Sequence, residues 1–186
     1  MKVGIIQSNY IPWRGYFDFI DDVDVFLLYD DVPFGTGKKW RNRNKVKTTN
    51  GTKWLTVPLK SGREKKLIEE VEIDYTHNWG KKHLATLHEN YRNAPFYTDY
   101  IEAFSNILEQ EHRSISQLNR ALSIWIMDIL NINTKLKMSH EYEVPASSKY
   151  ERPLQILKTM GATHYLLGAV AKSYTNENAF KDLGIT

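Results

Sequence analysis

The sequence contains no cysteine and no long apolar run. Without cysteine, disulfide bonds, thiolate nucleophiles and the common cysteine-based zinc sites are excluded. The apolar stretch near the N-terminus, Val3 to Ile6, is too short for a secretory signal. A membrane-spanning helix needs roughly 20 apolar residues, and no segment approaches that length. These absences predict a soluble, cytoplasmic protein that does not insert into a membrane.

A large excess of one charge sign is also missing, since the formal net charge is only +3 over 186 residues. This small excess argues against a nucleic-acid partner for the molecule as a whole. The two signs are nevertheless separated along the chain. Acidic residues gather in one segment and basic residues in the next: Asp18, Asp21, Asp22, Asp24, Asp30 and Asp31, then Lys38, Lys39, Arg41, Arg43, Lys45 and Lys47. The separation predicts a local site for an anion.

The N-terminal apolar pattern predicts a β-α-β unit. Residues 3–7 and 25–29 are short apolar runs, typical of parallel strands that are buried on both faces. Between them, Pro12 suits the first turn of a helix, and apolar residues recur at helical spacing over residues 12–21. We therefore expect an α/β fold with a Rossmann-like, mostly parallel sheet.

Later segments predict an inserted β-hairpin and a helical subdomain. Residues 43–48 and 53–59 favour two strands joined at Asn50-Gly51, a dipeptide typical of a type I′ turn. Residues 67–75 alternate imperfectly between apolar and acidic side chains, which predicts an edge strand. Three apolar stripes at helical spacing follow: Leu84, Leu87 and Tyr91; Tyr97, Ile101, Phe104 and Leu108; and Ile115, Leu118, Leu122, Ile126 and Ile129.

The C-terminal part returns to the α/β pattern. Residues 153–160 predict a helix that ends at Gly161, and residues 164–167 a strand with His164 in the core. We expect a single domain over residues 1–186. Within it, residues 1–75 and 136–186 form the α/β core, which includes the hairpin of residues 40–59, and residues 76–135 form the helical subdomain.

The turn after the first strand is the first candidate binding site. In an open α/β sheet, ligands bind at the carboxyl ends of the strands, where a helix N-terminus offers free N–H groups to an anion. Glycine is costly inside a helix, so a close approach of ligand or backbone would explain Gly15. We expect ligand contacts from Gln7, Tyr10, Trp13, Gly15 and Tyr16. The alternative is that the aromatic residues only pack in the core.

The basic segment is the second candidate. On a strand, Lys39, Arg41, Arg43 and Lys45 would share one face, and Trp40, Asn42 and Asn44 the other. Guanidinium groups bind phosphate or carboxylate through paired hydrogen bonds. We expect Trp40, Arg41, Asn42, Arg43 and Asn44 to meet the first turn at a common hollow and bind ligand there. A solvated edge strand and a surface for single-stranded nucleic acid are the alternatives.

Carboxylates and a histidine supply the candidate catalytic groups. Asp30 and Asp31 follow the second strand, at the sheet edge that carries the first turn, where either could orient a sugar hydroxyl or act as a base. Adjacent aspartates also cap or turn the chain. His77 and His83 bracket the start of a helix, where histidine is usually a structural hydrogen-bonding residue. We expect Asp30, Asp31 and His77 as catalytic candidates, and no metal site.

Several of these blocks together resemble the WbqC-like family. The blocks are Gln7-x-x-Tyr10-x-Pro12-Trp13-x-Gly15-Tyr16-Phe17, Tyr29-Asp30-Asp31-Val32, Trp40-Arg41-Asn42-Arg43-Asn44, Trp54-Leu55-Thr56-Val57-Pro58 and His77-Asn78-Trp79. The resemblance covers nearly the whole chain. It implies a bacterial protein of O-antigen and other surface-polysaccharide biosynthesis, acting in nucleotide-sugar pathways. A looser likeness in layout links the N-terminal unit to nucleotidyltransferases with a His-x-Gly-His signature, whose histidines this chain lacks.

The resemblance favours a protein that binds a nucleotide-linked amino sugar, or another anionic small molecule, and modifies it by an acyl-type transfer. Arg41, Arg43 and Lys172 are then expected to bind phosphate. A non-catalytic sugar-nucleotide binding or scaffold protein is the alternative. The resemblance names no cofactor and leaves an oligomer open. The chain departs from the family at Leu167-Gly168-Ala169-Val170, which keeps only the glycine of a Ser-Gly-Pro-Ser-like turn, and ends some tens of residues earlier than most members.

Overall fold

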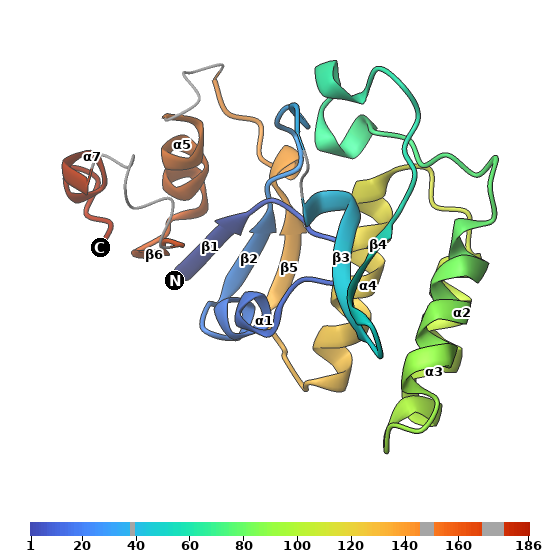
Figure 1. Cartoon of the computed structure of the whole chain (residues 1–186). Helices are drawn as coiled ribbons and strands as arrows, with labels where there is room; N and C mark the ends of the chain where they lie inside the picture. Colours follow the sequence, from blue (N-terminus) through green and yellow to red (C-terminus); the bar gives the residue numbers. More distant parts are fainter. Residues whose placement is uncertain (38–39, 146–150, 169–176) are drawn as a thin grey trace. The chain divides into compact units, whose positions relative to one another are not determined.

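The computed structural model describes residues 1–37, 40–145, 151–168 and 177–186, which form two compact units (Figure 1). The parallel-sheet unit comprises Met1–Gln7, Trp13–Asp31 and Met127–Thr186, and the hairpin–helix unit comprises Ser8–Pro12 and Val32–Ile126. This grouping differs from the one expected from the sequence, because the hairpin belongs with the helices and not with the parallel sheet.

The parallel-sheet unit contains a four-stranded sheet in the order β5-β2-β1-β6, with every neighbouring pair parallel. The strands are β1 (Lys2–Ile6), β2 (Val25–Leu28), β5 (Lys135–Met138) and β6 (His164–Leu166). The β-α-β unit expected at the N-terminus is confirmed. Strand β5 had no signal in the sequence, because its four residues alternate lysine with apolar side chains and resemble a solvated segment.

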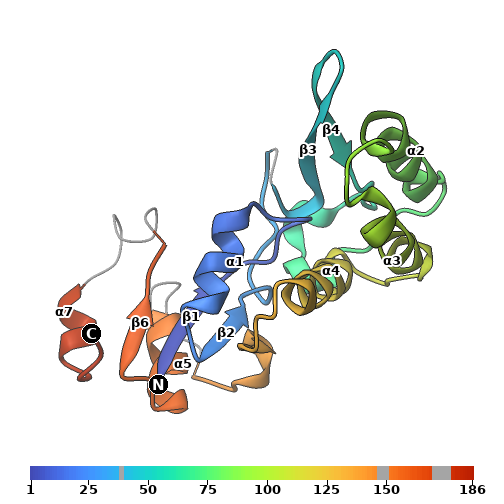
Figure 2. The same cartoon turned by 90° about the horizontal axis from the view of Figure 1, so that it is seen from below.

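Helices cover both faces of this sheet (Figure 2). They are α1 (Arg14–Asp21), α5 (Glu151–Met160) and the short α7 (Glu177–Lys181). One face carries a core cluster in which Val3, Ile5, Val25 and Leu27 pack with Ile156 and Leu157 of α5. On the opposite face, the Tyr16 and Phe19 rings of α1 lie 5.4 and 5.9 Å from the Phe26 ring. A parallel sheet covered in this way explains why its central strands are continuously apolar.

Gly4 permits the close packing of α1 on the sheet. A Cβ atom at this position would lie 2.6 Å from Cε1 of Phe19, which is shorter than any relaxed contact. We expect Gly4→Ala to lower the free energy of unfolding by at least ~1 kcal/mol, as overpacking does in other cores. Gly80→Ala is the matched control, because its Cβ would meet Leu108 at an ordinary 3.7 Å. Denaturant unfolding should show the loss for Gly4 only; equal effects would contradict this packing.

The hairpin–helix unit joins a two-stranded antiparallel sheet to three helices. The strands are β3 (Arg43–Thr48) and β4 (Gly51–Thr56), and the helices are α2 (Trp79–Tyr91), α3 (Tyr97–Glu109) and α4 (Ile115–Ile129). Short 3-10 turns cover Trp40–Asn42, Arg63–Lys65 and Ile68–Glu70 here, and Ser139–Glu141 in the other unit. The expected hairpin and the three helices are confirmed. Their shared core includes Tyr10, Leu55, Trp79, Phe104 and Leu118.

Three local expectations were wrong. In the described part of the chain, positive φ at non-glycine residues occurs only at Ile11 and Asn131, so Asn50 cannot form a type I′ turn; the left-handed residue is Gly51 (φ 105°), as in a turn with a bulge. Residues 67–75 form a 3-10 turn and isolated bridges instead of an edge strand, although Ile68, Val71 and Ile73 are buried. His164 is exposed, because the short strand β6 lies at the sheet edge.

The longest helix in the described residues is α4, with 15 residues. None of the described helices combines the length and the apolar composition needed to cross a membrane.

Candidate functional site

The carboxyl edge of the parallel sheet is set by the strand order. The chain runs outward from β1 through β2 to β5, and then returns through α5 to place β6 on the other side of β1. In open α/β sheets, ligands bind in the crevice at the carboxyl ends of the strands where the order reverses in this way. In this sheet the reversal lies between β1 and β6. The residues that follow these strands and β2 are Gln7, Leu167-Gly168 and Tyr29-Asp30-Asp31.

Tyr16 and Asp30 are the buried polar groups of this edge. Both residues have no exposed surface. The Tyr16 hydroxyl donates a hydrogen bond to the Gln7 carbonyl oxygen at 3.2 Å. Burial, and secondarily the negative charge of Asp30, raise the pKa of the Tyr16 hydroxyl well above its ordinary value, so this group remains a donor. The edge therefore joins a fixed phenol and a buried carboxyl at the ends of β1 and β2.

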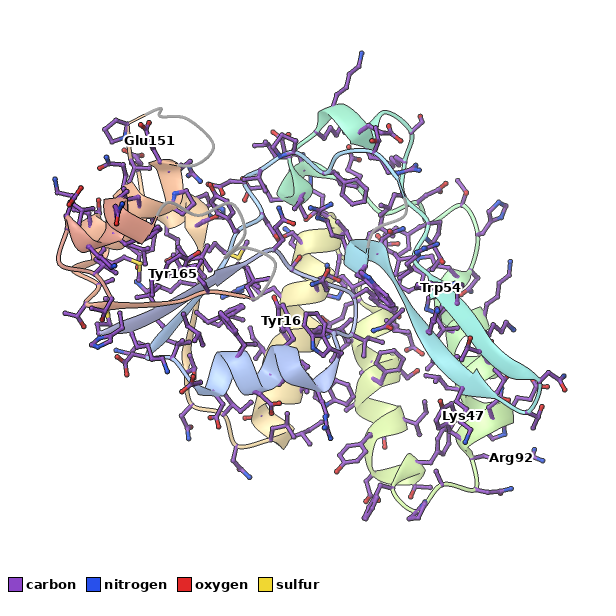
Figure 3. The ribbon with its side chains drawn as sticks, turned by 60° about the vertical axis from the view of Figure 1, so that its left-hand side comes forward. Tyr16, Lys47, Trp54, Arg92, Glu151 and Tyr165 are labelled. Atoms are coloured by element: carbon purple, nitrogen blue, oxygen red, sulfur yellow. The ribbon has the colours of Figure 1, made fainter. Side chains whose placement is uncertain are left out.

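Trp13 provides an exposed aromatic surface beside Tyr16. The Trp13 side chain is 61% exposed, and its ring lies 5.7 Å from the Tyr16 ring. A Cβ at Gly15 would stand 2.7 Å from Nε1 of Trp13. Gly15 therefore makes room for the indole over the first turn of α1, which explains a glycine that is otherwise costly in a helix. Figure 3 shows Tyr16 between this helix and the strands.

Asp31 is held in an ion pair. Its carboxylate accepts hydrogen bonds from the Ser139 hydroxyl at 2.5 Å and from the Arg152 guanidinium. Burial by itself lowers the pKa of the Arg152 guanidinium, but hydrogen bonds to Asp31 and Tyr29 raise this pKa above its ordinary value. Burial also raises the pKa of the Tyr29 hydroxyl, although Arg152 opposes this rise. Asp31 therefore ties the end of β2 to α5, and its catalytic role stays a prediction.

Tyr10 and Arg41 have structural partners within the hairpin–helix unit. The Tyr10 side chain has no exposed surface, and its hydroxyl bonds Nδ1 of His83 at 3.0 Å. Its backbone N–H donates to the Trp40 carbonyl at 3.1 Å. Arg41 donates from Nη1 to the Phe34 carbonyl at 2.7 Å. The packing expected as the alternative for Tyr10 is present, because its ring belongs to the core of this unit.

Asn42 and Asn44 hold the backbone of this unit. The Asn42 side-chain amide donates to the Val57 carbonyl at 2.9 Å. The Asn44 amide donates to the Ile11 carbonyl and more weakly to that of Tyr10. Ile11 has a φ of 44°, a left-handed conformation that is costly for a branched residue, and the Asn44 bonds stabilise it. Both asparagines thus fix the segment around Tyr10.

The expectation that one strand carries both Arg41 and Arg43 was wrong, because Trp40–Asn42 form a 3-10 turn and the strand begins at Arg43. Arg41 and Arg43 therefore do not share a strand face. Arg43 lies over the Trp54 ring, with Cζ 3.9 Å from the centroid, and the Trp40 ring lies 5.0 Å from the same ring. Lys38, Lys39 and Lys172, and the turn beyond Gly168, lie outside the described residues.

The two histidines at the start of α2 differ in environment. His77 is exposed, and its carbonyl accepts the N–H of Trp79 at 2.7 Å. His83 is 4% exposed, and burial lowers its pKa to about 4, although a hydrogen bond to the Thr56 backbone opposes this shift. His83 thus has the structural role expected from its position. No group of three or more His, Asp or Glu side chains within the described residues could hold a metal ion.

The structure also brings in residues that the sequence did not single out. Ser139 and Arg152 join the carboxyl edge through Asp31. Asn119 is buried on α4 and donates to the Ser8 hydroxyl at 3.0 Å and the Arg41 carbonyl at 2.8 Å. Ser139 and Arg152 lie more than a hundred positions from Asp31, so no local pattern could have paired them. The expected turn is divided between the units, and a common hollow with the basic segment stays a prediction.

This geometry defines a mixed α/β protein with a candidate ligand site at the carboxyl edge of a parallel sheet. The chain belongs to the WbqC-like protein family, which matches residues 7–186. It is similar to Rv1507c, an uncharacterized protein of Mycobacterium tuberculosis (strain ATCC 25618 / H37Rv). The two are 44% identical over 186 residues, which cover 99% of this chain and 79% of that protein. No solved structure matches the chain at a significant level.

Proposed function

We propose that the protein binds a nucleotide-linked amino sugar at the carboxyl edge of its parallel sheet and modifies it by an acyl-type transfer in surface-polysaccharide biosynthesis. The observation that carries the proposal is the reversal of strand order beside β1, with buried Asp30 and Tyr16 at the same edge. Doubly wound sheets bind nucleotides at such a point. The chain belongs to the WbqC-like family, and the pathway is the one that the resemblance of its sequence blocks leads us to expect.

The residues of the edge would have distinct tasks. The exposed face of Trp13 packs against the sugar or the base, as aromatic side chains do in small-molecule sites. Asp30 accepts a hydrogen bond from a sugar hydroxyl or from the amino group. In acyl transfer, the sugar nitrogen attacks the carbonyl carbon of an acyl thioester and forms the C–N bond, and the nitrogen loses a proton to Asp30 as general base. The C–S bond breaks, and sulfur leaves with its electron pair as a thiolate.

A non-catalytic sugar-nucleotide binding protein is the second candidate. It is favoured by the pairing of Asp31 with Arg152 and Ser139, which commits one of the two expected catalytic carboxylates to structure. Turnover separates the two functions. The protein is incubated with UDP-linked and dTDP-linked amino sugars and an acyl thioester, and the mass of the sugar product is followed. A mass increase supports the transferase, and saturable binding without it supports the binding protein.

Replacing Asp30 tests the site itself. We expect Asp30→Asn to weaken calorimetric binding of the nucleotide sugar at least ~10-fold, because a hydrogen bond to a charged group contributes about 1.5–3 kcal/mol. Asp18→Asn is the matched control, since Asp18 is exposed on α1. Thermal unfolding of both variants shows whether the fold is retained. Equal affinity of folded Asp30→Asn and native protein would remove Asp30 from the site.

A further inference from the structure

The β3–β4 hairpin has two chemically different faces. In its register, Arg43, Lys45 and Lys47 pair with Thr56, Trp54 and Thr52, so these six side chains share one face. On this outer face, all but the half-buried Arg43 are exposed. On the opposite face, Leu55 is buried in the core and Val46 packs against it. The hairpin therefore needs only one face for folding, and the other is available to a partner.

The outer face combines cations with stacked aromatic rings. Arg43 and Lys45 lie over the Trp54 ring, with Cζ at 3.9 Å and Nζ at 5.0 Å from its centroid. Trp40 adds a second indole at 5.0 Å from Trp54, and it is 51% exposed. No acidic residue occurs between Val32 and Arg63 in the sequence. The face therefore carries uncompensated positive charge from its own segment beside the exposed Trp40 ring and a Trp54 ring that Arg43 and Lys45 partly cover.

Helix α2 extends the charge at the turn of the hairpin. The backbone N–H of Lys47 donates to the Tyr91 hydroxyl at 2.9 Å, and that of Thr49 to the Asn90 side chain at 3.3 Å. These bonds place the end of α2 against the hairpin, so that Arg92 follows Tyr91 near Lys47 (Figure 3). Arg92 thus adds a cation at the turn end of the hairpin, beyond the row that Arg43, Lys45 and Lys47 form on the outer face.

We propose that this outer face binds single-stranded nucleic acid. Alternate residues of a strand are about 7 Å apart, so Arg43, Lys45 and Lys47 form a regular row for successive phosphates. Bases stack on exposed aromatic side chains beside such rows in single-strand-binding proteins. A free nucleotide would occupy one cation and leave the rest of the row unused. A solvated edge that only discourages aggregation needs charge but gains nothing from two exposed indoles.

The binding is measured by fluorescence anisotropy with a fluorescein-labelled 15-residue oligothymidylate over a series of salt concentrations. Three phosphate contacts give a slope of log K against log salt of about −2, and Lys45→Gln should reduce its magnitude by about 0.7. Trp40→Ala should weaken binding roughly tenfold at unchanged slope, because it removes stacking and no charge. Lys158→Gln, an exposed lysine of α5, is the matched control and should have no effect.

Three results would overturn the proposal: no binding at the lowest salt, affinity that Trp40→Ala and Lys45→Gln leave unchanged, or equally tight binding of a duplex of the same length. Thermal unfolding verifies that both variants remain folded, which their exposed positions favour. Trp54→Phe keeps a ring in place and should lose less affinity than Trp40→Ala. The nucleotide-sugar site is not involved, because Asp30→Asn should bind the oligonucleotide as the native protein does.

Discussion

Replacing Asp31 with asparagine should lower the free energy of unfolding by about 3 kcal/mol. The Asp31 carboxylate is 8% exposed and neutralises Arg152, whose Nη1 is already buried without a hydrogen-bond partner in the described part of the chain. Removing one partner of a largely buried ion pair leaves the other charge uncompensated, which costs about 3–5 kcal/mol. Because Arg152 is partly exposed, we expect a loss of unfolding free energy at the lower end of this range. Denaturant unfolding at neutral pH measures it.

The exposed pair Lys2–Asp22 provides the control for this loss. Its N–O distance is 2.7 Å, but the Asp22 side chain is 61% exposed. Asp22→Asn should therefore cost less than about 1 kcal/mol. The double variant Asp31→Asn with Arg152→Met should recover part of the loss, because it no longer buries a lone cation. If Asp31→Asn unfolds like the native protein but loses ligand, Asp31 belongs to the chemistry and not to the scaffold.

Acid should destabilise the hairpin–helix unit through His83. The neutral ring shares a hydrogen bond between Nδ1 and the Tyr10 hydroxyl and lies 5.2 Å from the Trp79 ring. Its pKa in the folded protein is about 4, against an ordinary 6.5. Between these values the unfolded chain binds the proton and the folded chain does not, so stability is complete above the unfolded pKa and falls as the pH decreases. This difference between the folded and unfolded pKa of His83 corresponds to about 3 kcal/mol of unfolding free energy.

The test compares the native protein with His83→Gln, because other groups titrate in the same range. Unfolding free energies are measured between about pH 7.5 and about pH 4 for both proteins. We expect the native protein to lose about 3 kcal/mol more than the variant over this range. Parallel pH curves would contradict the buried neutral histidine. The ring resonances of His83 should show the same low pKa when the titration is followed directly by NMR.

Much of the fold is predictable from the sequence because its signals are local. The continuous apolar runs of β1 and β2 and the helical spacing of α2, α3 and α4 depend on burial along one element, and all five elements are confirmed. In α2, however, the buried residues are Trp79, His83 and Thr86, and the predicted stripe is only partly buried. Residues 67–75 show the limit of this approach. These residues alternate between apolar and acidic side chains, but they form isolated bridges and a 3-10 turn and no strand. Ile68, Val71 and Ile73 are nevertheless buried. Burial was predictable there, but the hydrogen bonds were not.

The candidate site was predictable only in part. The position of Asp30 after β2 follows from the rule that ligand sites lie at carboxyl ends, and that rule needs only strand order. The partners of Asp31 are distant in sequence, and the ring of Tyr10 is buried by α2, so neither could be read from spacing. Arg41 illustrates a further difficulty: a charge in a basic run looks available until the structure shows that it holds a nearby carbonyl oxygen.

Mapping of a nucleotide sugar by NMR tests the central claim most directly. A UDP-linked amino sugar is titrated into isotope-labelled protein, and the backbone amide shifts are followed to saturation. We expect the largest changes at the residues after β1, β2 and β6, namely Gln7, Asp30 and Gly168. Saturable changes confined to residues 43–56, or to a surface away from this sheet edge, would contradict it.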